Sequence, residues 1–125
     1  MPSDIRVIYV RDFVKATVQG TFDLDSSRQA LLEIAAAVPS SSAVDVMIDV
    51  RDAPADLSLS QLSELAMEFN RSRLGVGRKT AVLTAKDRFD NAHFFAISAR
   101  GMGRNVQAFT SFEEAFDWLA LQSSN

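Results

Sequence analysis

The chain has 125 residues, a formal net charge of −3 and no cysteine. This length corresponds to one domain that can bury a substantial apolar core. Disulfides, thiolate nucleophiles and cysteine metal ligands are excluded, and a single histidine, His93, argues against a zinc site. We therefore expect no metal and no cofactor. The N-terminus does not resemble a signal peptide and no apolar run approaches the ~20 residues of a membrane span, so we expect a cytoplasmic location.

Charge is distributed unevenly along the chain. Between Arg71 and Arg104 there are eight basic side chains and two acidic ones. Such a segment indicates either a patch that binds anions or an acidic partner, or ordinary surface charges that scatter when the chain folds. The basic residues have no regular helical spacing, which favours the second interpretation. We predict no nucleic-acid partner.

The first predicted element is an antiparallel hairpin that turns at residues 11–12 and ends at Gly20. Pairing Val10 with Phe13 sorts apolar from polar residues, because three pairs then share one apolar face: Ile5 with Val18, Val7 with Ala16, and Tyr9 with Val14. On the more polar face we expect an exposed apolar area formed by Ile8, Val10, Phe13 and Met47. A homodimer through this area is a further hypothesis.

After the hairpin, helices and strands alternate. We predict helices that begin at Asp25 or Ser26, at Ser58, at Phe89 and at Ser111, and strands over Val44–Val50, Thr80–Thr84 and Val106–Phe109. Ser26 with Gln29, Ser58 with Gln61 and Ser111 with Glu114 match capping boxes, and Gly101 is predicted to be a left-handed C-cap. The order ββαβαβαβα predicts one α/β domain over residues 1–125. Its five-stranded mixed sheet is expected to be parallel except for the opening strand.

Three passages occur in an order that is found in a known family. Val18–Asp23 leads from a strand through glycine to aspartate, Val46–Val50 is a buried strand that contains Asp49, and Asn105–Ala115 joins a closing strand to a helix. In this order they resemble the SpoIIAA-like domains, the superfamily of sulfate transporters and anti-sigma factor antagonists (STAS). The resemblance is greatest to stand-alone bacterial proteins of unassigned function, which are sometimes grouped with lipid-binding Sec14-type domains.

The resemblance implies a non-enzymatic regulatory module that binds another protein. The alternative is a small carrier or sensor of an apolar, lipid-like ligand. Anti-sigma factor antagonists carry Asp-Ser-x-Gly after the central strand, and the serine is phosphorylated; here Asp49 is followed by Val50-Arg51-Asp52. The candidate switch or partner-binding residues are therefore Ser58, Ser60, Asp49 and Asp52. The simpler interpretation of Ser58 is a helix N-cap.

Phenylalanines in the second and third helices suggest a ligand pocket. The candidate pocket residues are Phe69, Phe94 and Phe95, and the alternative is that they only fill the core. A hollow between these helices would favour the carrier, whereas a solid core with exposed loops would favour the partner-binding module. No spacing of residues indicates a catalytic site, so we predict that the protein is not an enzyme.

Overall fold

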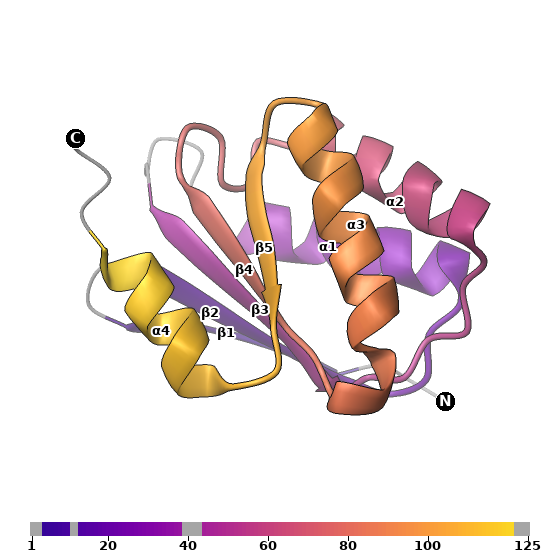
Figure 1. Ribbon diagram of the computed structural model, residues 1–125, viewed down its shortest axis with the longest axis horizontal. Helices are drawn as coiled ribbons and strands as arrows, with labels where there is room; N and C mark the ends of the chain where they lie inside the picture. The colour runs from indigo at the N-terminus through magenta and orange to yellow at the C-terminus, as the bar shows by residue number, and fades with distance from the viewer. Residues whose placement is uncertain (1–3, 11–12, 39–43, 122–125) are drawn as a thin grey trace.

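Five strands form one sheet and lie side by side in the order in which they occur in the chain (Figure 1). The computed structural model describes residues 4–10, 13–38 and 44–121. β1 (Asp4–Val10) is antiparallel to β2 (Phe13–Gln19), and β3 (Asp45–Asp52), β4 (Lys79–Leu83) and β5 (Asn105–Phe109) continue the sheet parallel to β2. The predicted five-stranded mixed sheet is confirmed.

The register of the hairpin is the one that its apolar alternation predicts. Val10 pairs with Phe13, and the three apolar pairs follow: Tyr9 with Val14, Val7 with Ala16, and Ile5 with Val18. A slip of one residue would turn every side chain of β1 to the opposite face, so the buried face of β2 specifies this register strongly. The predicted turn at residues 11–12 lies outside the described residues.

Helices cover both faces of the sheet. α1 (Leu24–Ala37), α2 (Leu59–Arg71) and α3 (Phe89–Gly101) pack on one face, and α4 (Phe112–Ala120) packs on the other (Figure 1). A short 3₁₀ helix, Lys86–Arg88, leads into α3. The predicted order ββαβαβαβα is confirmed.

Each face of the sheet has its own hydrophobic core. The larger core lies under α1, α2 and α3 and includes Val14, Ile48 and Val82 from the strands. The smaller core lies under α4 and contains Phe13, Met47, Ala81, Leu83, Phe109, Ala115 and Leu119. β3 and β4 are therefore buried on both faces, as central parallel strands usually are.

The apolar area that we expected on the second face is exposed only in part, since Ile8 is 52% exposed and Val10 is half-buried while the other two residues are covered. Phe13 is 5% exposed and Met47 is 0% exposed, because α4 covers them. The Phe13 ring meets the Phe116 ring of α4 edge-on, with 5.7 Å between the ring centroids. Strand alternation identified the residues that share this face, but it could not show that the last helix returns to cover them. Of the four residues named for the homodimer hypothesis, Ile8 and Val10 thus remain accessible, and the hypothesis stays a prediction without structural support.

Two of the predicted helix ends are wrong by a few residues. The N-cap of α1 is Asp23, whose carboxylate accepts a hydrogen bond from the Ser26 amide (2.9 Å), while the Ser26 hydroxyl accepts one from the Asp23 amide (2.8 Å). Ser26 is thus the partner in the capping box and not the cap. Gly101 is the last residue of α3, and the left-handed residue is Gly103 (φ 96°). The N-caps Ser58 and Ser111 are confirmed.

Candidate functional site

The loop between β3 and α2 is held at the C-terminal edge of the sheet. The amide of Gly20 donates to the carbonyl oxygen of Asp52 (3.2 Å), and the amide of Phe22 donates to that of Pro54 (3.0 Å). Phe22 and Ala55 also form a parallel bridge. The loop therefore runs alongside the segment that joins β2 to α1, in the position where open α/β sheets place their binding sites.

Side chains of this loop alternate between two surroundings. Asp52, Pro54, Asp56 and Ser58 are exposed, whereas Ala53 and Leu57 are buried. Ala53, Ala55 and Leu57 all line a cavity beneath the loop. One strip of chain thus has a polar outer surface and an apolar inner surface.

The first turn of α2 continues the outer surface. The hydroxyl of Ser58 accepts a hydrogen bond from the Gln61 amide (3.2 Å), and the Gln61 side chain accepts one from the Ser58 amide (3.0 Å). The hydroxyl oxygens of Ser58 and Ser60 are 3.3 Å apart, and both residues are exposed. Leu59 between them is 59% exposed, so the turn presents one large apolar side chain beside two hydroxyls.

Asp49 lies apart from this surface. It is 5% exposed on the face of the sheet covered by α4, whereas Ser58, Ser60 and Asp52 are exposed. The Arg51 guanidinium donates to both of its carboxylate oxygens (3.0 and 2.8 Å), and the Lys15 ammonium is 3.6 Å away. Burial by itself would raise the pKa of Asp49, but the hydrogen bonds and charges of Arg51, with the charge of Lys15, outweigh it and hold that pKa below its ordinary value. Asp49 is therefore ionised and already paired.

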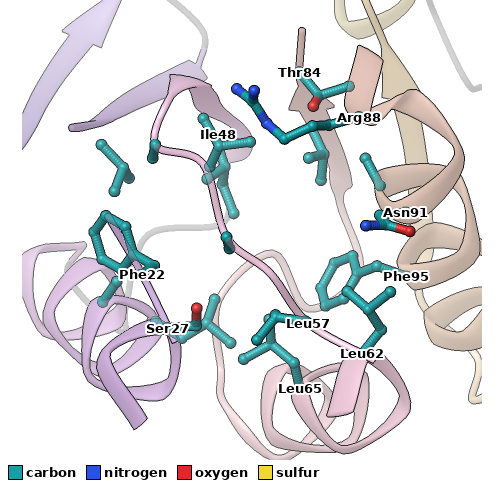
Figure 2. A pocket seen from close by; sticks show the side chains of 18 of the residues that line it. Phe22, Ser27, Ile48, Leu57, Leu62, Leu65, Thr84, Arg88, Asn91 and Phe95 are labelled. Atoms are coloured by element: carbon teal, nitrogen blue, oxygen red, sulfur yellow. The ribbon is translucent and has the colours of Figure 1, made fainter. Parts of the chain in front are cut away.

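A cavity of about 150 Å³ lies between the sheet and the helices α1, α2 and α3 (Figure 2). Its walls are mostly aliphatic and aromatic. Of the three phenylalanines that we singled out, Phe95 lines the cavity. Phe69 is fully buried and meets Phe95 edge-on at 5.8 Å, and Phe94 is half-buried outside the lining.

Three polar side chains lie together on one side of the cavity. Thr84 follows β4, Arg88 ends the 3₁₀ helix and Asn91 lies in the first turn of α3, opposite Leu57, Leu62 and Leu65 (Figure 2). The sequence analysis did not identify these three residues. They follow the C-terminal end of β4. Open α/β sheets place their binding sites at the C-terminal ends of parallel strands, so this position is as suitable for a site as the end of β3. No spacing signal distinguished them.

Several basic side chains between Arg71 and Arg104 form hydrogen bonds or ion pairs with other structural elements. The Arg104 guanidinium donates to the carbonyl oxygens of Asn70, Ser72 and Leu74, and the Lys79 ammonium donates to those of Trp118 (2.7 Å) and Leu121 (2.6 Å). Arg78 pairs with Asp45 (3.1 Å). These cations therefore form no continuous patch for an anion.

Residues 4–10, 13–38 and 44–121 contain neither a metal-binding cluster nor a membrane-spanning helix. No group of histidine, aspartate and glutamate side chains in these ranges is arranged to hold a metal ion. None of the helices found there has the length and apolar character needed to cross a bilayer.

Comparison with known proteins identifies the fold. No family model and no curated protein matches the sequence. An anti-sigma factor antagonist from Mycobacterium paratuberculosis is similar in structure, with a TM-score of 0.61, 16% identity and 94% of each chain covered. An uncharacterised DUF3478-family protein with a SpoIIAA-like fold from Shewanella loihica has a TM-score of 0.58 and 14% identity, again over 94% of each chain. The chain therefore has the SpoIIAA-like fold that its three sequence passages implied.

Proposed function

We propose that this protein is a non-enzymatic regulatory module that binds another protein through the outer surface of the β3–α2 loop and the first turn of α2. The observation that carries the proposal is the alternation of this loop, which presents Asp52, Pro54, Asp56 and Ser58 outward on a backbone pinned to the β2–α1 segment. A surface already held in place loses little conformational freedom on binding. The fold shared with an anti-sigma factor antagonist supports the same class of function.

A catalytic role is not part of the proposal. Asp49 is the buried carboxylate nearest to this surface in sequence, and its pairing with Arg51 and Lys15 keeps it ionised. A general acid must hold a proton at the working pH, and a general base must have a free lone pair directed at its substrate. Asp49 meets neither requirement.

The test compares two serines that have the same structural role on opposite faces of the sheet. Ser58 and Ser111 each cap a helix and accept a hydrogen bond from the amide three residues later (3.2 and 3.3 Å). Aspartate caps as well as serine does, so Ser58→Asp and Ser111→Asp should both fold. Each variant is immobilised beside the wild type and exposed to a lysate of the source organism, and the retained proteins are quantified by mass spectrometry.

The proposal requires a protein that the wild type and Ser111→Asp retain and that Ser58→Asp loses. Retention of every protein to the same extent by all three would contradict binding through this surface. A protein that Ser111→Asp alone fails to retain would instead place the contact on the face of the sheet covered by α4.

A second candidate function has its own observation in favour. The cavity of about 150 Å³ beneath the same loop supports a carrier or sensor of a small apolar molecule. Native mass spectrometry of the purified protein tests it, because a retained ligand adds a defined mass that disappears on denaturation. A purified protein that shows only the mass of its own chain, even after incubation with small apolar compounds, would count against this candidate.

A further inference from the structure

We infer that the cavity takes a small monocarboxylic acid, with its apolar body among the leucines and its carboxylate at Arg88. This inference rests on the second candidate function and names its ligand class. It follows from the size of the cavity, the position of Arg88 in its lining and the surroundings of that charge.

The volume limits the apolar body. An apolar cavity of about 150 Å³ is large enough for benzene, and drug-sized ligands occupy roughly 300–1,000 Å³. A single ring or a chain of about six carbons therefore fits, whereas a diacyl lipid or a nucleotide does not. The leucine side chains from the loop and α2 supply the walls for such a body (Figure 2).

Arg88 supplies the charge. Among the described residues that line the cavity, it is the only one with an ionised side chain, and its neighbours on that side are the hydroxyl of Thr84 and the carboxamide of Asn91. Figure 2 shows the Arg88 side chain extending across one end of the cavity towards β3. Its side chain is 24% exposed, so the guanidinium lies at the rim, where an anionic head group can reach it without full desolvation.

The guanidinium retains donors for a ligand. It donates one hydrogen bond to the carbonyl oxygen of Arg51 (2.7 Å), and its nearest carboxylate, Asp87, is 3.5 Å away and 79% exposed. A guanidinium has five N–H donors, and an ion pair with so exposed a partner contributes little. One cation with free donors matches a planar monoanion, since a carboxylate accepts two parallel N–H bonds from arginine. A phosphate dianion or a polyphosphate would need further cations, and the described residues of the lining include none besides Arg88.

The experiment compares acids with neutral molecules of the same shape. Phenylacetate and hexanoate are titrated into ¹⁵N-labelled protein beside phenylacetamide and hexanamide, and affinities are obtained from amide shifts of cavity residues. We expect each acid to bind about tenfold more tightly than its amide, because the charge-assisted hydrogen bond is the stronger one. In Arg88→Gln this preference should disappear, with the affinity for the amides retained.

Two further variants control for charge and for location. Lys86→Gln removes a cation two residues away that does not line the cavity, and the preference for acids should persist. Ala92→Leu adds three carbons to the cavity wall and should lower the affinity for all four compounds at least tenfold. Thermal unfolding verifies that this variant is folded.

The outcomes distinguish failure of the carboxylate site from failure of the second candidate function, the carrier or sensor of a small apolar molecule. Equal binding of acids and amides to the wild type, or a preference that survives Arg88→Gln, would overturn the carboxylate site and leave an apolar-ligand function standing. If none of the four compounds shifts the cavity residues, both the carboxylate site and the second candidate function are wrong. Shifts that persist unchanged in Ala92→Leu would place binding outside the cavity and overturn the inference.

Discussion

Arg51 and Asp49 form a two-point ion pair within one strand, with N–O distances of 3.0 and 2.8 Å, and the Arg51 amide donates a third bond to the same carboxylate (3.1 Å). The two side chains are in different surroundings, since that of Asp49 is 6% exposed and that of Arg51 is 42% exposed. The carboxylate thus depends on the arginine and on Lys15 for its only counter-charges within the described chain.

Replacing Asp49 with asparagine should destabilise the protein at neutral pH. Asparagine keeps the shape but leaves Arg51 and Lys15 without their counter-charge, and we expect a loss of about 1–3 kcal/mol in the free energy of unfolding. Urea unfolding measures the loss. Asp52→Asn, an exposed neighbour at the end of β3, is the control and should change stability by less than about 0.5 kcal/mol.

The same pair predicts how stability depends on pH. Folding lowers the pKa of Asp49, so the unfolded chain takes up this proton first as the pH falls. Its contribution is complete above the ordinary value of 3.8 and is lost as the pH falls through the lower pKa of the folded state. The stability gap between wild type and Asp49→Asn should therefore narrow below about pH 4. A gap of constant size from pH 7 to pH 3 would contradict this assignment.

Ser58 should behave as an N-cap in stability measurements whatever its role in binding. Ser58→Ala removes the acceptor for the Gln61 amide and should cost about 0.5–2 kcal/mol, whereas Ser58→Asp should be nearly silent. Ser111→Ala and Ser111→Asp are the matched pair on α4. Equal destabilisation by Ala and Asp at position 58 would show that the hydroxyl contributes something other than capping.

Local patterns predicted most of the fold. The alternation of β1 and β2 determined the hairpin register because one face of β2 is buried, and the serine caps placed the starts of α2 and α4. The start of α1 was misplaced because Asp23 and Ser26 are both competent caps, and local sequence does not rank them. The packing of α4 over Phe13 and Met47 depends on the path of the chain after β5, which no local pattern records.

The candidate site was predictable on its outer side only. Pro54 and the capping serine Ser58 mark the β3–α2 loop as an exposed, stiffened connection, and the structure places it at the expected sheet edge. Small side chains from separate elements contribute to the lining of the cavity, among them Ala30, Ala53 and Ala92. Alanine at these positions is also what close helix packing requires, so the sequence contains no sign that space is left between them.

Two glycines in the turn before β4 should differ in their tolerance of a methyl group. Gly75 and Gly77 both have positive φ (69° and 74°), so alanine strains either backbone by about 1–2 kcal/mol. A Cβ on Gly75 would also lie 2.5 Å from the hydroxyl oxygen of Thr80, which is 1% exposed, whereas a Cβ on Gly77 meets nothing within 4 Å. Gly75→Ala should therefore lose about 1–3 kcal/mol more than Gly77→Ala in urea unfolding. Equal losses would show that Thr80 moves aside freely.

Arg104 should be a structural arginine that lysine cannot replace. Its guanidinium donates to three carbonyl oxygens at the end of α2 and after it, those of Asn70, Ser72 and Leu74, and lies 4.8 Å from the centre of the Phe69 ring. Burial lowers the pKa of Arg104, but a guanidinium remains charged across the physiological range. Carbonyl groups at a helix C-terminus have no partner within the helix. The Arg104 side chain therefore satisfies one such carbonyl, that of Asn70, together with those of Ser72 and Leu74 in the residues that follow α2.

Three variants separate the charge of Arg104 from its geometry. Arg104→Met keeps the apolar stem but leaves the carbonyls unpaired, and should cost about 1–3 kcal/mol in the free energy of unfolding. Arg104→Lys keeps the charge as a single point and should recover only part of that loss, because an ammonium cannot span three acceptors as the planar guanidinium does. Arg100→Met, which removes one bond to the Val106 carbonyl (3.2 Å) from an exposed position, should cost less than about 1 kcal/mol. If Arg104→Lys is as stable as the wild type, charge alone holds the end of α2, and the three-point geometry has no energetic role.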